Sequence, residues 1–260
     1  MTPLDMKILK IPFGEGGLGK TKDTAKAPDK IEKELKEIYL NENLNQLMLS
    51  CEEVKVENSN LSQIHKIIEK KIKNIDGRVV SIGGDHSITY SAFKGSQKSG
   101  LIVFDAHPDL MTGTQTPSHE DYLRKLIEEG YLNPEDVVLA GLRNIHGQEY
   151  EFLKENNIKH FTAKHIHKNG IANICDSLME TARKWDNFYI SVDIDVLDPA
   201  FAPATVHAEP AGLSTRDLLY IIQRLKFLNK SFDADLVEVS PSMDVNSMTS
   251  RVAAKIISEF

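Results

Sequence analysis

Residues 101–110, LIVFDAHPDL, join a short apolar run to three charged or titratable side chains. The run LIVF is typical of a buried strand, because short apolar segments bounded by polar residues suit the interior of a sheet. Asp105, His107 and Asp109 follow at alternate positions. If the backbone stays extended there, its period of two aims all three side chains the same way. The stretch therefore predicts a buried strand that ends in a polar cluster.

Similar apolar runs alternate with amphipathic segments along the chain. The other predicted strands cover residues 6–11, 78–82, 137–141, 159–163, 188–192 and 235–239. The predicted helices include one carrying Ile31, Leu35 and Ile38, one with Leu61, Ile64, Ile68 and Ile72 on one face, and the ranges 122–129, 171–185, 215–228 and 247–260. Such alternation favours a parallel α/β sheet with helices on both faces. Because no repeat or linker interrupts it, we expect a single domain over residues 1–260.

The composition of the chain argues against nucleic acid and membranes as binding partners. The 260 residues carry a net charge of −7, which argues against a general electrostatic grip on nucleic acid. No apolar run approaches the roughly 18 residues of a membrane span, and the N-terminus lacks the apolar core of a signal peptide. Cys51 and Cys175 lie far apart and are expected to be reduced thiols. We expect a cytoplasmic protein that binds neither nucleic acid nor membrane.

Two further strands are followed by the same kind of side chain. In YISVDIDVLDP, residues 189–199, Asp193 and Asp195 leave the end of an apolar run, and in VVSIGGDHS, residues 79–87, His86 does so. Ligands of open α/β sheets bind beyond the carboxyl ends of the strands, so we expect these residues to meet Asp105, His107 and Asp109 at one edge. Four carboxylates in a small space would raise one another's pKa, and a multivalent cation removes that cost.

The joint pattern predicts a metal centre, although a lone aspartate after a strand is usually a cap or turn residue. The number of candidate ligands suggests two ions, and a carboxylate-rich set with few imidazoles suits Mn²⁺. Two ions that share a water would lower its pKa from about 15.7 towards about 7. A hydroxide nucleophile would then form without a Ser/His/Asp or Cys/His arrangement, and none is evident in the chain.

Five motifs and the last residues of the chain resemble those of a known protein family. The motifs GGDHS, DAHPDL, SVDIDVLDPAFAP, EPAGLS and DLVEVSP, in this order between residues 83 and 241, resemble those of the ureohydrolases (arginase, agmatinase and relatives), and residues 248–260 resemble the family's last helix. The resemblance implies an arginase/deacetylase-like three-layer α/β/α fold, a homo-oligomer and two Mn²⁺ ions per subunit. By motif, one ion would be held by His86, Asp105, Asp109 and Asp193, and the other by Asp105, His107, Asp193 and Asp195.

The resemblance also implies the roles of catalytic residues. Glu238 matches the glutamate that pairs with the guanidinium of the substrate, and a carboxylate suits that planar group because it accepts two parallel hydrogen bonds. His119 matches a histidine that can relay a proton to the leaving amine. The metal-bridging hydroxide would attack the guanidinium carbon and Asp109 would handle the proton of the intermediate. The products would be an amine and urea.

The loops depart from the arginase pattern. Residues 141–149, GLRNIHGQE, have Asn144 and His146 where arginases have an acid that contacts the substrate's ammonium group, and residues 111–120 lack the Ser/Asn pattern that holds its carboxylate. Both differences favour a small guanidino substrate such as agmatine, with His146, Glu209, Glu238 and His119 as predicted contacts. Residues 201–214, FAPATVHAEPAGLS, introduce His207 and Glu209, and Glu209 would suit agmatine's ammonium. Arginase or formiminoglutamase activity and a non-catalytic metal-binding relative remain alternatives.

Residues 14–21, GEGGLGKT, match the phosphate-binding pattern G-x-x-x-x-G-K-[ST]. A phosphate-binding loop needs a helix that begins at its Gly-Lys-Thr and points its amides at the phosphate. Here no apolar periodicity begins before Ile31, and Pro28 is suited to open that helix. The segment is therefore predicted to be a loop over the carboxyl edge of the sheet, with Lys20 in solvent.

Overall fold

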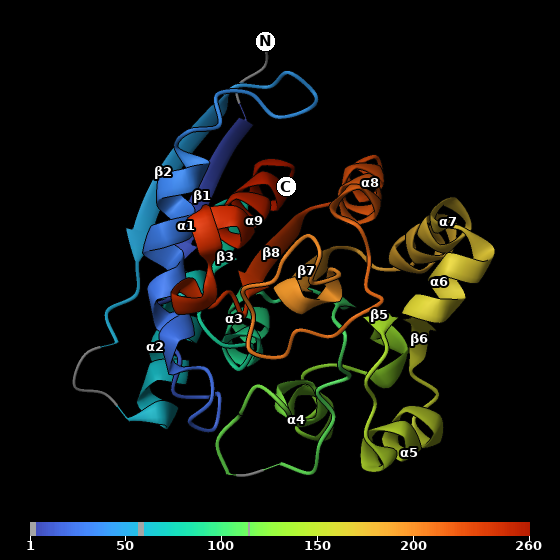
Figure 1. The fold of residues 1–260 in the computed structure, drawn as a ribbon. Helices are drawn as coiled ribbons and strands as arrows, with labels where there is room; N and C mark the ends of the chain where they lie inside the picture. The colour runs from blue at the N-terminus through green and yellow to red at the C-terminus, as the bar shows by residue number, and fades with distance from the viewer. Residues whose placement is uncertain (1–3, 57–59, 114) are drawn as a thin grey trace.

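An eight-stranded sheet forms the centre of the computed structural model, which describes residues 4–56, 60–113 and 115–260 (Figure 1). The strands are β1 (Leu4–Lys10), β2 (Leu47–Glu53), β3 (Val79–Ile82), β4 (Gly100–Phe104), β5 (Val137–Leu142), β6 (Lys159–Thr162), β7 (Phe188–Asp193) and β8 (Phe232–Val237). They lie in the order β2-β1-β3-β8-β7-β4-β5-β6, and every strand pairing is parallel. The prediction of a parallel α/β sheet is confirmed.

Helices cover both faces of the sheet (Figure 1). They are α1 (Ala27–Leu35), α2 (Leu61–Lys73), α3 (Ile88–Ser96), α4 (Tyr122–Glu128), α5 (Gly147–Glu155), α6 (Ala163–Asn169), α7 (Ile171–Ala182), α8 (Thr215–Lys226) and α9 (Met248–Ser258). Residues of α1, α6, α7, α8 and α9 share one buried apolar cluster, and residues of α2, α3, α4 and α5 share another. Neighbours along a strand divide between them, as Leu101 and Ile102 do, because successive side chains alternate between faces. The result is the expected three-layer α/β/α arrangement.

Some elements differ from the prediction. Strand β2 was not predicted, because as an edge strand it buries only part of its side chains and carries two glutamates, so its sequence LMLSCEE gives a weak apolar signal. Helices α3, α5 and α6 were also missed; α3 is buried almost all round and therefore has no polar face to mark its period. Ile38 lies beyond the end of α1, and Leu61 is exposed rather than on the buried face of α2.

The strand order places four carboxyl ends side by side. β3 and β4 follow each other in the chain, but β8 and β7 lie between them in the sheet. The loops after β3, β8, β7 and β4 therefore leave the same edge as neighbours. This change in strand order is the kind of position at which α/β proteins bind ligands.

The segment 14–21 crosses this edge and does not open a helix. A 3₁₀ turn (Lys22–Lys26) follows, and α1 begins only at Ala27 with Pro28 in its first turn, as predicted. The amide of Gly16 donates to the carboxylate of Asp85 at 2.8 Å, so it is already used within the protein. The side chain of Lys20 is 54% exposed and pairs with Glu120 at 3.3 Å. This arrangement rules out a phosphate-binding loop here.

Within the described residues, no helix is both long and apolar enough to cross a membrane.

The close approach of Gly84 to the backbone of Phe13 can be tested by substitution. A Cβ atom at Gly84 would lie 1.7 Å from the carbonyl oxygen of Phe13, a backbone atom that cannot turn away. We expect Gly84→Ala to lower the free energy of unfolding by about 2 kcal/mol or more, measured by urea denaturation. Gly147→Ala is the control, because a Cβ there meets nothing within 4 Å, and it should change stability by less than about 0.5 kcal/mol. Equal stability of the two variants would contradict the packing.

Candidate metal centre

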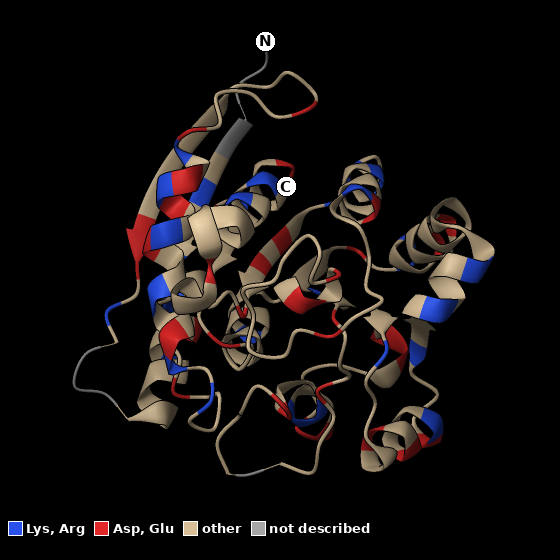
Figure 2. Cartoon of the chain, in the orientation of Figure 1, with Lys and Arg blue, Asp and Glu red and all other residues tan. Residues whose placement is uncertain are grey.

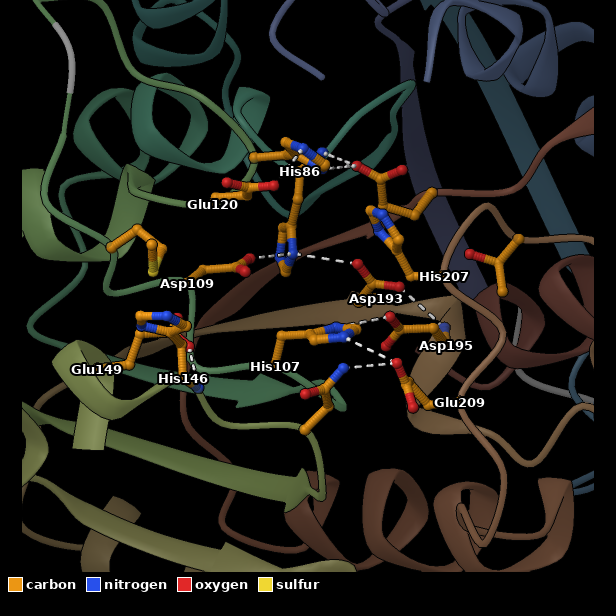
Figure 3. Close-up of a pocket in the computed structure, with 15 residues that line it drawn as sticks. His86, His107, Asp109, Glu120, His146, Glu149, Asp193, Asp195, His207 and Glu209 are labelled. Atoms are coloured by element: carbon orange, nitrogen blue, oxygen red, sulfur yellow. Dashed lines mark hydrogen bonds and ion pairs between the residues drawn. The ribbon is translucent and has the colours of Figure 1, made fainter. Parts of the chain in front are cut away.

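Six side chains meet beyond the carboxyl ends of β3, β4 and β7, as the sequence predicted, and Figure 3 shows them with the exception of Asp105. The loop after β3 supplies one imidazole, the loop after β4 supplies one imidazole and two carboxylates, and the end of β7 supplies two carboxylates. The residues are His86, Asp105, His107, Asp109, Asp193 and Asp195.

One group of donors surrounds Nδ1 of His86. This nitrogen lies 3.1 Å from Oδ2 of Asp105, 3.0 Å from Oδ2 of Asp109 and 3.3 Å from Oδ2 of Asp193. His86, Asp105 and Asp109 offer three ligand atoms within 4.8 Å of one another, a spacing that could hold one metal ion.

A second group surrounds Nδ1 of His107. This nitrogen lies 3.0 Å from Oδ2 of Asp195 and 3.5 Å from Oδ1 of Asp105. Asp105, His107 and Asp195 again offer three ligand atoms within 4.8 Å. Because Asp105 belongs to both groups, its carboxylate lies between the two candidate ion positions.

Backbone amides fix the orientation of these carboxylates. Oδ1 of Asp105 accepts from the amide of His107 at 2.6 Å, Oδ1 of Asp193 from Asp195 at 2.8 Å, and Oδ1 of Asp195 from Ala106 at 3.0 Å. In each case the Oδ2 oxygen remains and faces an imidazole. One oxygen of each of these aspartates is therefore held by a backbone amide, within the local turn for Asp105 and Asp193 and from the loop after β4 for Asp195, and the other oxygen faces the centre.

The backbone does not stay extended beyond the ends of these strands. β4 ends at Phe104, residues 194–196 form a 3₁₀ turn, and Asp109 has a φ of 53°, in the left-handed region. The side chains converge because of these turns, and period-two alternation has no part in it. Glu238 also has a positive φ, of 65°, and such backbone strain is concentrated at functional sites.

The donor groups fit a cation. Asp105 and Asp193 are at most 4% exposed, and no lysine or arginine among the described residues pairs with a carboxylate of the six. Nδ1 of His86 and Oδ2 of Asp105 are buried, face each other, and have no hydrogen-bond partner in the described chain. A cation between them would satisfy both atoms, and oxygen donors with a minority of imidazoles suit a divalent ion such as Mn²⁺.

Burial and the closeness of the charged groups shift the pKa values of the site when no metal is bound. Burial and the charge of Asp105 raise the pKa of Asp109 to about 8. Burial and the charges of Asp195 and Asp105 raise the pKa of Asp193 well above its usual range. Burial opposes protonation of His107, but hydrogen bonds to Asp105 and Asp195 raise its pKa to about 12. Without a metal, the site therefore retains protons that its ligands would have to release on binding one.

Glu238 and His119 lie beside the donor groups. Oε1 of Glu238, just beyond β8, accepts from the amide of His86 at 2.8 Å and lies 3.6 Å from Nδ1 of His119. Burial lowers the pKa of His119, but its contact with the charged carboxylate of Glu238 outweighs this effect and raises it. The amide of His119 donates to the carbonyl of Gly16, so the glycine-rich loop holds this histidine at the edge.

A cavity of about 280 Å³ lies over these residues (Figure 3). Glu209 enters it from the loop after β7; its Oε1 accepts from Nδ2 of Asn144 at 2.7 Å and lies 3.6 Å from Nε2 of His107. The ring of His207 stacks on that of His119, with centroids 5.6 Å apart. His146 also lines the cavity, but it caps α5 as well, its Nδ1 accepting from the amide of Gln148 at 3.3 Å.

Sequence reasoning did not identify the remaining lining residues, which are Met111, Glu120, Asn144, Glu149 and Thr205. The sequence marks Asn144 only as a departure from the arginase pattern. Glu149 completes the capping box of α5 with His146, so its sequence context indicates a helix start and gives no sign of a cavity. Glu120 adjoins His119 but lacks a motif of its own.

Known proteins match this chain over most of its length. The model of the arginase family matches residues 4–260. An arginase from Staphylococcus aureus (strain COL) is 33% identical over 217 residues, 76% of this chain and 72% of that protein. A formimidoylglutamase from Halalkalibacterium halodurans is 33% identical over 206 residues, 75% of this chain and 64% of that protein. The agmatine ureohydrolase structure from Thermoplasma volcanium aligns with a TM-score of 0.83 and 26% identity, over 98% of this chain and 88% of that chain.

The raised pKa values predict how stability depends on pH. A group whose pKa is raised on folding binds its proton more tightly in the folded state, so the free energy of unfolding falls as pH rises between its two pKa values. For Asp109 this interval runs from about 4 to about 8, and for His107 from about 6.5 to about 12. Asp105, whose pKa is lowered, stays ionised above pH 6.5 and adds no slope.

We therefore expect the melting temperature of chelator-treated protein to fall between pH 6.5 and 8.5. Added Mn²⁺ should stabilise the protein more at pH 8.5 than at 6.5, because its ligands bind deprotonated. Asp109→Asn should flatten the slope of the metal-free protein. Differential scanning calorimetry measures all three effects, and a melting temperature that rises through this interval without metal would refute the assignment.

Proposed function

The chain belongs to the arginase family, and from that premise we propose that it hydrolyses an agmatine-like guanidino compound to an amine and urea. His86, Asp105, Asp109 and Asp193 would hold one Mn²⁺ ion, and Asp105, His107, Asp193 and Asp195 the other. Bound there, two divalent cations would supply the positive charge that lowers the pKa of a water and polarises the substrate.

The side chains around the cavity have matching roles. Glu238 would pair with the planar guanidinium and hold its carbon over the donor groups. Asp109 would take the proton that the attacking water loses. His119, 3.6 Å from Glu238, would give a proton to the leaving nitrogen as its bond to carbon breaks. Its raised pKa favours the protonated, donor form near neutral pH.

The charges of the side chains that line the cavity favour a substrate with a cationic tail. Outside the donor groups, the described residues that line it include four carboxylates and three imidazoles, but no lysine or arginine. A substrate with a carboxylate head, such as L-arginine or formimidoylglutamate, would place that charge beside acids. A cationic tail avoids the repulsion, which supports agmatine over both.

Glu209 is the acid best placed for that tail. Glu149 accepts two backbone amides, from Leu110 and His146, and Glu120 is paired with Lys20. Arg143 donates to the backbone carbonyl of Glu209 at 2.7 Å, but no lysine or arginine of the described chain pairs with its carboxylate. The side chain of Glu209 is 28% exposed and lines the cavity. Its contact with Asn144 leaves the carboxylate charge available to an ammonium group.

L-arginine is the second candidate, because the Staphylococcus aureus relative that is 33% identical is an arginase. The α-ammonium group of arginine would suit Glu209 equally well. Its carboxylate would need a partner, and Lys20, which pairs with the lining residue Glu120 at 3.3 Å, is a basic side chain that could supply one.

A substrate panel tests the proposal. We expect Mn²⁺-loaded protein to release urea from agmatine with a higher kcat/KM than from L-arginine, and to release no formamide from formimidoylglutamate. Asp195→Asn should remove both activity and bound metal, whereas Lys20→Ala should retain most activity. Preference for L-arginine or formimidoylglutamate would refute the agmatine-like assignment. No product from any compound, with both ions bound, would show a non-catalytic relative.

A second experiment isolates the tail contact. Glu209→Gln should lower kcat/KM for agmatine roughly 10-fold or more, because a charge-assisted contact contributes about 1.5–3 kcal/mol. Butylguanidine, which has the same guanidinium but no ammonium, should be hydrolysed at nearly the wild-type rate. Glu120→Gln is the matched control and should have the smaller effect on agmatine. Equal losses on both substrates would mean that Glu209 acts through His107 and does not contact the tail.

A further inference from the structure

Strand β8 carries a buried acid that the proposed reaction does not use. Asp235 lies three residues before Glu238 and is 0% exposed. Figure 2 shows acidic segments on β8, whose sequence FDADLV contains two aspartates. The other, Asp233, pairs with Lys98 at 3.1 Å, but no cationic side chain of the described residues pairs with Asp235. A buried carboxylate without a cation is costly, so its surroundings need an explanation.

Three hydroxyl groups donate to Asp235. Oδ1 accepts from Ser191 at 2.7 Å, and Oδ2 accepts from Thr89 at 2.8 Å and from Tyr189 at 2.9 Å. Thr89 belongs to α3, which follows the loop of His86, and Ser191 and Tyr189 belong to β7, the neighbour of β8 in the sheet. Burial raises the pKa of Asp235, while these hydroxyl groups act in the opposite direction and favour its charged form.

The hydrogen bonds continue from Ser191 to His86. Nε2 of His86 lies 2.9 Å from Oγ of Ser191. A hydroxyl has one proton, and Ser191 gives it to Asp235, so Ser191 must accept from Nε2–H. With its proton on Nε2, His86 can turn the lone pair of Nδ1 towards Asp105, Asp109 and Asp193.

We propose that Asp235, acting through Ser191, is a positioning residue that fixes the orientation and tautomer of His86 for the ion held by His86, Asp105, Asp109 and Asp193. The chain Asp235–Ser191–His86 also puts a second layer of negative charge behind that ion. Groups that orient metal-ligating histidines in this way typically change metal affinity 10- to 100-fold. This inference rests on the metal centre of the proposed function.

The test measures metal binding directly. Wild-type protein should bind two Mn²⁺ ions per chain in isothermal titration calorimetry, with anomalous diffraction locating each ion. Ser191→Ala and Asp235→Asn should each weaken the ion next to His86 by 10- to 100-fold, and should weaken the ion next to His107 much less. Ser191→Ala removes only one hydroxyl, so it keeps the test valid if Asp235→Asn folds poorly.

Two controls separate positioning from a general structural effect. Asp233→Asn makes the same change on the same strand, at a carboxylate that accepts from the amide of Val79 at 2.9 Å, and should leave both affinities unchanged. Tyr122→Phe removes a hydroxyl next to the ring of His86 that has no hydrogen-bond partner in the described chain, and should also leave them unchanged. The double variant of Ser191 and Asp235 should lose no more affinity than the worse single variant, because both act through one chain.

The outcomes distinguish this inference from the proposed function. Unchanged Mn²⁺ affinity in both Ser191→Ala and Asp235→Asn, or an equal loss in Asp233→Asn, would overturn the positioning role and leave the metal centre intact. Wild-type protein that binds no Mn²⁺ at either position would overturn both. Losses confined to the ion next to His86 support the proposal.

Discussion

Mutual repulsion among four carboxylates, buried at one edge of a parallel sheet, is the constraint on which the rest of this structure depends. Asp105, Asp109, Asp193 and Asp195 lie close to two imidazoles and have no lysine or arginine partner among the described residues. Removing charges from water without a partner costs several kcal/mol each, so such a group persists only where protons or cations compensate it. The raised pKa of Asp109 and the unpartnered Nδ1 of His86 show how the metal-free protein bears that cost.

The sheet makes this concentration of charge possible. β8 and β7 lie between β3 and β4, so four loops leave adjacent strands at the same edge. Apolar layers on both faces hold the strands rigidly, and backbone amides hold one oxygen of three of the aspartates. Binding geometry is thus set by packed strands and short turns, which are more precise than long loops.

The polar groups are arranged in successive layers around the centre. Ser191 and Asp235 lie on the Nε2 side of the His86 imidazole, and the donor oxygens lie on its Nδ1 side. Beyond them lies the cavity, which both Glu209 and Glu238 line. The same arrangement therefore occurs behind His86, at the donor groups and in the cavity: a hydrogen bond orients a carboxylate towards a group that is or can become cationic.

The parallel α/β sheet and the six side chains that meet at its edge were predictable from the sequence, because apolar runs followed by acids or a histidine at strand ends are local patterns. Glu238 and His119 were assigned through the resemblance to the ureohydrolases, and their roles stay predictions. It missed β2, which is half exposed, and α3, which is buried all round, because neither shows the periodicity of its class. Residues 14–21 match the sequence pattern of a phosphate-binding loop but not its structure, because no α-helix begins there.

Only the tertiary structure decided how the ligands converge, which acids line the cavity and what supports His86. The turn at Asp109, the approach of Glu209 to His107 and the hydrogen bonds of Asp235 join residues from different strands and loops. Local sequence patterns report which face of an element is buried. They do not report which side chains from distant segments come within hydrogen-bond distance, because that depends on strand order and packing across the whole sheet.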